Sequence, residues 1–301
     1  MSEFVIAADL KEVYLTPPDS TKIHKPVSDF DSARAFHYLK KQVDFGPRAP
    51  NSIGHKKTKS FIIKTLGKLA DTVSEDRFTK RINDETYMLT NIFAIFKGHS
   101  KKILLLGAHW DTRPWADKDS NPSNHQKPIL GANDGASGVA VLMEIAHVLN
   151  KSKPPYTVIL AFFDGEDLGT NSRPNNFLIG SKRFAANMGS LRPNEAIIID
   201  MIGDKDLQIN SEMISITAAP DLLSRVLKAA DEVGAKSIFG GPPIEIIDDH
   251  LPLIYQGVKA IDLIDFTYPH WHTLADTPDK CSPISLEIVG KIILQFTYNG
   301  S

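Results

Sequence analysis

The residues best suited to chemistry stand where apolar segments of the sequence end. His109 and Asp111 follow the apolar run 104–108, and Asp134 lies in the glycine-rich loop 131–138. In open α/β sheets, ligands bind outside the carboxyl ends of strands, where loops converge without disturbing the core. Carboxylates and imidazoles on such rigid supports are suitable ligands for a metal ion such as zinc. We therefore predict that Asp134 is the first ligand of a zinc ion.

Two adjacent carboxylates, Glu166 and Asp167, come just after the apolar segment 157–164. Neighbouring acids repel each other unless a cation or a shared proton holds them together. A solvated turn is the alternative interpretation. The buried strand expected before the pair, together with Asp134, favours a functional site.

Acids also follow two later apolar segments. Asp200 stands at the end of the apolar segment 196–201, and Asp248-Asp249-His250 opens a short apolar segment. A helix N-cap is the alternative for this second group, because Asp favours the positive end of a helix. We expect Asp249 and His250 to be structural and Asp248 to face the site.

A histidine pair follows the last predicted strand. His270 and His272 flank Trp271 in this loop. Catalytic zinc typically takes three protein ligands and keeps one position open. Asp134, one member of the Glu166/Asp167 pair and a loop histidine would complete that set, and the remaining acid would be free to move protons.

The segments that must position these residues alternate between strand and helix patterns. This alternation predicts a three-layer α/β fold, with a mixed, mostly parallel central sheet flanked by helices. The loop 111–133 is long enough to indicate a functional role. The expected helices span 29–45, 54–70, 135–150, about 180–188, 221–233 and 283–296. The expected strands span 72–79, 87–96, 102–109, 157–164, 196–201, 206–210 and 258–265. We expect 72–79 and 87–96 to be antiparallel to each other and 206–210 to be an added antiparallel arm.

Composition limits the class of protein. The chain has 301 residues, of which 42% are hydrophobic, and a formal net charge of −2. Charge this close to zero indicates neither a nucleic acid nor an anionic membrane as partner. No apolar run approaches the roughly 20 residues of a membrane-spanning helix, and the N-terminus lacks the pattern of a signal peptide. The single cysteine, Cys281, excludes an internal disulfide and a thiolate-rich metal site.

We predict two regions in the chain. Residues 1–28 carry Pro17, Pro18 and Pro26 and are expected to form an extended N-terminal arm. Residues 29–301 contain no linker or repeat and are expected to form one catalytic domain.

From about Phe30 to the C-terminus, the sequence resembles the zinc aminopeptidase-like exopeptidases, and within them the glutaminyl-peptide cyclotransferases, or glutaminyl cyclases. The run 109–117 is most similar to bacterial members. The motifs that carry the resemblance are His109-Trp110-Asp111, Asn133-Asp134-Gly135-Ala136-Ser137-Gly138, Asp164-Gly165-Glu166-Asp167, Asp200-Met201, Asp248-Asp249-His250 and Trp271-His272-Thr273.

The resemblance implies a phosphorylase/hydrolase-like fold and a role for each matched residue. Asp134, Asp167 and His272 match the zinc ligands, and Glu166 matches the general acid/base. Asp200 and Asp248 match two acids of a hydrogen-bonded proton network, and Trp271 matches an aromatic wall of the substrate pocket. His109 occupies the position that holds a second metal in two-zinc aminopeptidases, where Asp200 would be its partner.

Two departures from the animal cyclases affect the pocket. Asp167 stands where those enzymes usually have Glu, and the loop 168–176 lacks their tryptophan. Phe177 or Trp115 is a candidate substitute, and Trp110 is a further candidate for substrate binding.

The resemblance implies a monomeric enzyme with one zinc ion, which converts the N-terminal glutamine of peptides and proteins to pyroglutamate and releases ammonia. It also favours a periplasmic or secreted location. The alternative on the same scaffold is a two-zinc aminopeptidase. A non-catalytic binding domain is disfavoured, because every matched ligand is present.

Overall fold

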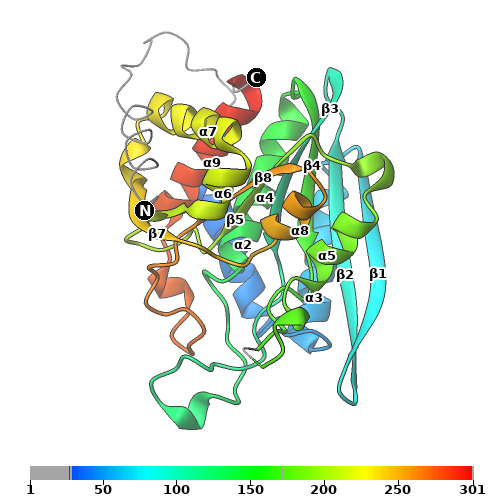
Figure 1. Ribbon diagram of the computed structural model, residues 1–301, viewed down its shortest axis with the longest axis vertical. Helices are drawn as coiled ribbons and strands as arrows, with labels where there is room; N and C mark the ends of the chain where they lie inside the picture. Colours follow the sequence, from blue (N-terminus) through cyan, green and yellow to red (C-terminus); the bar gives the residue numbers. More distant parts are fainter. Residues whose placement is uncertain (1–26, 28, 171, 300–301) are drawn as a thin grey trace, which may run out of the picture.

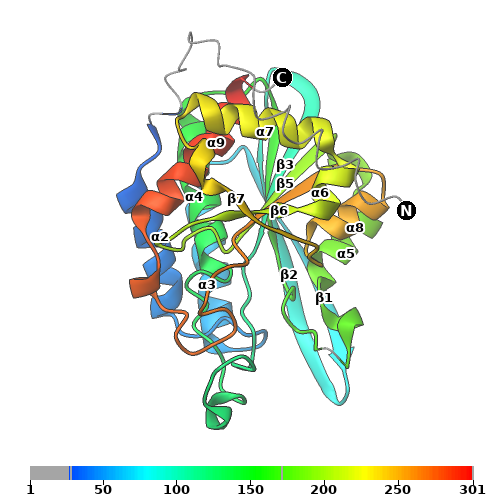
Figure 2. The same cartoon turned by 60° about the vertical axis from the view of Figure 1, so that its left-hand side comes forward.

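A six-stranded sheet between two layers of helices forms the centre of the molecule in the computed structural model, which describes residues 27, 29–170 and 172–299 (Figures 1 and 2). The strand order is β1-β2-β4-β3-β5-β8. The strands are β1 Thr72–Ile82, β2 Glu85–Phe96, β3 Ser100–His109, β4 Tyr156–Phe163, β5 Glu195–Asp200 and β8 Lys259–Ile264. The predicted mixed, mostly parallel sheet flanked by helices is confirmed.

The direction of the strands places four carboxyl ends at one edge. Strands β4, β3, β5 and β8 are parallel, whereas β2 runs antiparallel to both β1 and β4. Loops that leave the four parallel strands therefore start side by side, which is the arrangement that builds ligand sites in open α/β sheets.

Each face of the sheet has its own core, because side chains alternate along a strand. Leu104 and Leu106 of β3 belong to a large core under one helical layer, and Leu105 belongs to a core under the other. The first layer contains α2 Ser32–Asp44, α3 Ile53–Leu66, α4 Ala136–Lys151, α7 Pro220–Glu232 and α9 Pro283–Asn299, and the second contains α5 Ile179–Ala186, α6 Met213–Ala218 and α8 His250–Tyr255. Short 3-10 turns lie at Pro122–Asn124, Pro174–Asn176, Gly189–Leu191, Lys236–Ile238 and Pro278–Lys280.

Helix α4 supports the site from the interior of the molecule. It contacts β3, β4 and β5 on one side and α2 and α9 on the other. Its residues Ala136 to Ala146 are all buried. A helix enclosed on both sides is mostly apolar rather than amphipathic, and in α4 the buried Glu144 is paired with Arg34. This packing holds the loop that precedes the helix.

Several predicted elements differ from the structure. Helix α3 ends at Leu66 rather than residue 70, with Gly67 as its C-cap, and glycine is an unfavourable residue for a helix interior. The predicted antiparallel arm is wrong: β6 Ile209–Glu212 pairs in parallel with β7 Phe239–Ile244 in a separate small sheet. Two glycines and two prolines in β7 conceal the strand from sequence patterns.

The predicted N-terminal arm lies almost wholly outside the described residues. Only Val27 of that region is described, and it is buried. Among the described residues, no helix is both long and apolar enough to cross a membrane.

Candidate active site

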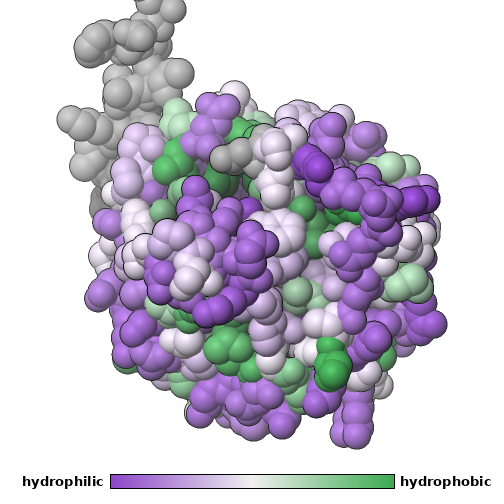
Figure 3. Space-filling view, turned by 90° about the horizontal axis from the view of Figure 1, so that it is seen from below, coloured by the Kyte–Doolittle hydropathy of each residue, from purple (hydrophilic) through white to green (hydrophobic). Residues whose placement is uncertain are grey.

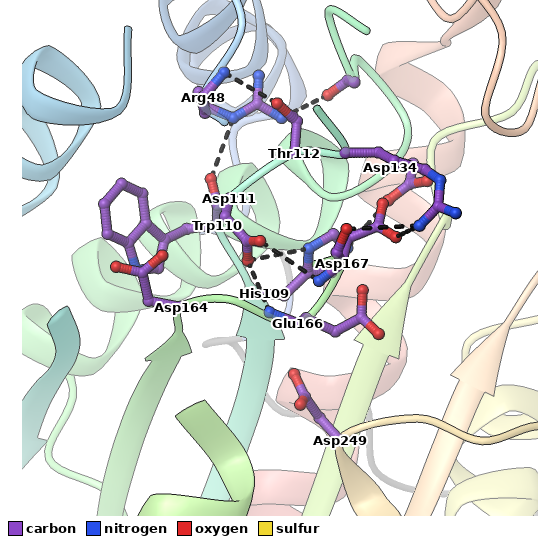
Figure 4. A network of polar contacts seen from close by, with 12 residues as sticks. Arg48, His109, Trp110, Asp111, Thr112, Asp134, Asp164, Glu166, Asp167 and Asp249 are labelled. Carbon is purple, nitrogen blue, oxygen red and sulfur yellow. Dashed lines mark hydrogen bonds and ion pairs between the residues drawn. The ribbon is translucent and has the colours of Figure 1, made fainter. Parts of the chain in front are cut away.

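Side chains from five separate segments converge beyond the carboxyl ends of the parallel strands. His109 ends β3, Asp200 ends β5, and the Glu166-Asp167 pair follows β4. Asp134 lies just before α4, and His272 lies in the loop after β8. Figure 4 shows His109, Asp134, Glu166 and Asp167 close together at this edge.

Asp134, Asp167 and His272 come together as one cluster. Each offers a ligand atom, and the three atoms lie within 4.8 Å of one another. The Nε2 atom of His272 is 3.5 Å from Oδ2 of Asp134 and 3.2 Å from Oδ2 of Asp167. Both of these carboxylate oxygens are buried without a hydrogen-bond partner. Buried oxygens are normally satisfied, so this donor set fits a cation.

A second cluster shares Asp134. The ligand atoms of His109, Asp134 and Asp200 also lie within 4.8 Å of one another. The Nε2 atom of His109 is 3.1 Å from Oδ1 of Asp134 and 3.2 Å from Oδ1 of Asp200. A Cβ atom added at Gly135 would lie only 2.4 Å from that nitrogen, so the approach of His109 requires glycine at this position.

Two carboxylates to which the sequence analysis assigned no role, Asp111 and Asp276, accept hydrogen bonds from the backbone of the site. Asp111 accepts hydrogen bonds from the N–H groups of Glu166, at 3.1 Å, and Asp167, at 3.3 Å. Asp276 accepts from the N–H groups of Asn133, at 2.8 Å, and Asp134, at 3.2 Å. Both carboxylates are fully buried, so they fix the position of this backbone rather than face solvent.

Arg113 and Asp117 orient two of the candidate ligands. The Arg113 guanidinium donates to Oδ1 of Asp167 at 2.7 Å and binds Asp117 through two hydrogen bonds, at 2.6 and 2.8 Å. Asp117 in turn lies 3.5 Å from Nδ1 of His272. One oxygen of Asp167 is therefore occupied, and only the other faces the cluster. The spacing of four residues between Arg113 and Asp117 is no signal in the sequence, because that spacing brings side chains together on a helix and this segment is a loop.

A fully buried arginine joins the start of the long loop to its end. Arg48 donates to the backbone carbonyls of Trp110, Leu130 and Gly131. Burial, opposed by nearby carboxylates such as Asp276, lowers the pKa of Arg48 to about 10. Nothing in the sequence around Arg48 indicates this role, because its partners are backbone atoms 62 to 83 residues away.

Burial and mutual repulsion favour protonated acids around the clusters. Burial, and then the charge of Asp167, raises the pKa of Glu166 well above its usual range. Burial, partly offset by His109, raises the pKa of Asp200 to about 7. Burial lowers the pKa of His272, but Asp167 and the other surrounding carboxylates outweigh it and raise this pKa to about 9. The site thus contains groups that can both accept and donate protons.

The clusters open into a cavity of about 450 Å³. Glu166, Asp200 and Asp248 line it, as do Asp134, Asp167 and His272. Figure 3, which views the molecule from the side of the strand ends, shows hydrophobic patches among hydrophilic residues. The remaining lining residues are mostly apolar: Thr170, Pro174, Phe177, Met201, Glu245, Ile246, Ile247, Ile264, Phe266 and Trp271.

The expected aromatic residues divide into cavity and core. Trp271 lines the cavity and stacks on His272, with ring centroids 3.9 Å apart. Trp110 requires a correction: it is fully buried, stacks on His55 at 4.2 Å and donates to the carbonyl of Thr90. Strand alternation places Trp110 on the same face as Ala108, away from Asp167 (Figure 4). Trp110 is therefore a packing residue of the core and does not line the cavity.

Trp115, the second tryptophan considered for substrate binding, also lies elsewhere than expected. Trp115 is not among the residues that line the cavity. Its ring packs instead against the Arg113 guanidinium, whose central carbon lies 5.4 Å from the ring centroid. Phe177, the other candidate substitute, does line the cavity and contacts the same guanidinium from 5.7 Å.

In the segment 248–250, the prediction that only Asp248 faces the site agrees with the geometry. Asp248 lines the cavity. Asp249 accepts a hydrogen bond from the Ser181 hydroxyl, and His250 lies in the interior, 3.4 Å from Glu212. Asp249 and His250 therefore connect α8 to its neighbours, and Asp248 alone of the three faces the cavity.

Comparison with known proteins relates this arrangement to a family. The model of peptidase family M28 matches residues 91–297. Among curated proteins, glutaminyl-peptide cyclotransferase of Bos taurus is 25% identical over 287 residues, which cover 83% of this chain and 77% of the bovine protein.

Solved bacterial structures are also similar along nearly their whole length. Bacteroides thetaiotaomicron glutaminyl cyclase is 36% identical, with a TM-score of 0.85 over 90% of this chain and 98% of that chain. A leucine aminopeptidase precursor from the same organism is 36% identical, with a TM-score of 0.86 over 91% of this chain and 98% of that chain.

Proposed function

The chain belongs to peptidase family M28, and we propose that it is a zinc-dependent glutaminyl cyclase that converts N-terminal glutamine to pyroglutamate. The observation that carries the proposal is the cluster of Asp134, Asp167 and His272 at a cavity that Glu166 also lines. Relatives that match most of the chain and are named as glutaminyl cyclases support this choice among the activities of the family.

The residues that would hold zinc are Asp134, Asp167 and His272. Carboxylates and imidazoles are both zinc ligands, and catalytic zinc typically takes three protein ligands and keeps one position open. When bound, the ion supplies Lewis-acid polarisation of the side-chain carbonyl of the substrate glutamine.

Glu166 moves the proton that the reaction requires. The α-amine attacks the side-chain carbonyl carbon, so that a new C–N bond closes a five-membered lactam. Glu166 accepts a proton from the attacking nitrogen and delivers it to the departing amide nitrogen as the old C–N bond breaks, and ammonia leaves. The attack is intramolecular, so the protein need only orient the substrate and exclude water.

The remaining residues of the cavity orient the substrate. Asp200 and Asp248 line the cavity with Glu166 and are suited to hold the amine by accepting its hydrogen bonds. Trp271 and the neighbouring apolar residues form a wall that excludes water from the reacting atoms.

The second cluster favours one other candidate, a two-zinc aminopeptidase. In that enzyme His109 and Asp200 would hold a second ion, Asp134 would bridge the two, and Glu166 would activate water. The ligand atoms of His109, Asp134 and Asp200 lie within 4.8 Å of one another, which supports this alternative.

Product analysis and metal counting separate the two candidates. The zinc-loaded protein is incubated in parallel with a glutaminyl peptide and an aminoacyl anilide, and the ammonia and the aromatic amine are measured. We expect ammonia, pyroglutamyl peptide and one zinc ion per chain. Release of the aromatic amine with two zinc ions per chain would replace the cyclase with the aminopeptidase.

A further inference from the structure

The opening of the cavity carries one charged group that the reaction does not use. Glu245 and Ile247 both line the cavity and are both exposed, and Ile247 retains 67% of its accessible surface. Between them, Ile246 is half-buried and packs with an apolar cluster that includes Met201 and Ile264. Glu245 and Ile247 therefore stand at the mouth of the cavity, and Asp248 follows them toward the interior.

This segment is held in place from beneath. The backbone N–H of Ile246 lies 3.4 Å from Oε1 of Glu212, to which it donates a hydrogen bond. Glu212 is buried and also receives the N–H groups of Ile214 and Ser215. The hydrogen bond to Glu212 fixes the backbone at Ile246, between the two exposed side chains, and therefore also limits the movement of Glu245.

The carboxylate of Glu245 has no counter-charge in the described part of the chain. None of the ion pairs or side-chain hydrogen bonds among the described residues involves it, and neither lysine nor arginine lines the cavity. By contrast, Asp134 and Asp167 face His272, and Asp200 faces His109. Glu245 is thus the unpaired charge of an outer wall that is otherwise mostly apolar.

We propose that Glu245 selects substrates that carry lysine or arginine shortly after the N-terminal glutamine. This inference rests on the proposed function, which places the glutamine at the inner end of the cavity. The following residues must then pass the mouth. A lysine or arginine side chain matches this surface, because its apolar stem can pack on Ile247 while its charged end stays in water beside Glu245.

The opposite charge preference has only one structural argument. The Lys118 ammonium lies 5.5 Å from the Trp271 ring centroid, but Lys118 does not line the cavity. It is therefore a weaker candidate for contact with substrate than Glu245. A preference for an acidic residue would assign the selecting role to Lys118 and overturn the proposal.

The test compares lysine with norleucine, which has a similar stem and no charge. Each is placed second, third or fourth after an N-terminal glutamine in otherwise identical peptides, and kcat/KM is measured by ammonia release. We expect lysine to be favoured about two- to five-fold at one of these positions at low salt, and less at about 0.5 M salt. Glu245→Gln should remove the preference, and Glu245→Lys should favour a glutamate-containing peptide instead.

Asp221→Asn is the matched control. Asp221 has an exposed side chain and pairs with Lys259, the first residue of β8, so it lies at the opposite edge of the sheet. Removal of its charge should leave the lysine/norleucine ratio unchanged.

The norleucine peptides keep the two proposals distinguishable. If the norleucine peptides are cyclised and the lysine peptides have the same kcat/KM at all three positions, the role of Glu245 is overturned and the cyclase stands. An unchanged lysine/norleucine ratio in Glu245→Gln has the same consequence. If the zinc-loaded protein cyclises none of the peptides, both proposals fail.

Discussion

Each candidate ligand at the strand ends is fixed by a residue that does not itself face the cluster. Arg113 occupies one oxygen of Asp167, and Asp117 lies beside the outer nitrogen of His272. Asp276 holds the backbone of Asp134. Such supporting contacts orient metal ligands and are needed for a preorganised site. At the scale of the residue, the site therefore consists of candidate ligands and of the residues that fix their positions.

Glu166→Gln tests the proton-transfer role at this scale. The change removes the acid/base group while it leaves Asp134, Asp167 and His272 in place, so we expect kcat to fall by at least about 10²-fold. Zinc content, measured by mass spectrometry, should stay equal to that of the wild type. Activity close to wild type would remove Glu166 from the mechanism.

Two tryptophan variants test the division between cavity and core. Trp271→Ala should raise KM for glutaminyl peptides, because Trp271 lines the cavity. Trp110→Phe should leave KM unchanged but lower the free energy of unfolding by about 2 kcal/mol, because a buried hydrogen bond and packing volume are lost. Steady-state kinetics and urea unfolding measure both variants. A raised KM in Trp110→Phe would return that residue to the substrate site.

At the scale of the element, the small helices α6 and α8 depend on one buried acid. Glu212 is the N-cap of α6 and lies 3.4 Å from Nε2 of His250, the first residue of α8. Burial raises the pKa of Glu212, but the contact with His250 and the hydrogen bonds from the start of α6 outweigh it and lower this pKa to about 2. The ionised carboxylate therefore stabilises the folded state.

Glu212→Gln should lower the free energy of unfolding by about 2–3 kcal/mol at pH 7. Because the folded pKa is depressed, this contribution is complete above the unfolded value near 4.5 and is lost as pH falls toward 2. The difference between variant and wild type in urea unfolding should therefore shrink between pH 4.5 and pH 2. Glu287→Gln, which alters the Lys291 pair on α9, is the surface control and should change stability by less than about 1 kcal/mol.

At the scale of the whole molecule, the two cores make a rigid sheet, and the metal ligands come from loops at one edge of it. Asp134, Asp167 and His272 are far apart in sequence and buried together. Repulsion between the two carboxylates, Asp134 and Asp167, opposes folding. A bound ion should therefore stabilise the fold as well as supply chemistry.

Removal of metal should lower the melting temperature of the protein. An ion at 100 times its dissociation constant stabilises the folded state by about 2.7 kcal/mol, which corresponds to a shift of several degrees for a chain of this size. Calorimetry before chelation, after chelation and after zinc is restored measures the effect. Asp167→Asn should show a much smaller shift, and an equal shift in that variant would exclude this cluster as the metal site.

The alternation of apolar segments was sufficient to predict the central sheet, its helical cover and the strand ends that carry His109, Glu166 and Asp200. These features follow from local rules, because hydrophobic period and chain breaks are properties of neighbouring residues. The motifs from His109 to His272 likewise identified the family, which the comparison confirms. The roles predicted for these residues in zinc binding and catalysis stay predictions.

Only the tertiary structure decided which side chains share a cavity and which support it. Asp111, Asp276 and Arg48 act through backbone groups far away in sequence, so their own surroundings in the chain carry no sign of the role. Trp110 and Trp271 are the same residue type beside candidate ligands, yet one packs in the core and the other lines the cavity. The physical reason is that burial and long-range hydrogen bonds depend on which segments meet, and this is a property of the assembled fold.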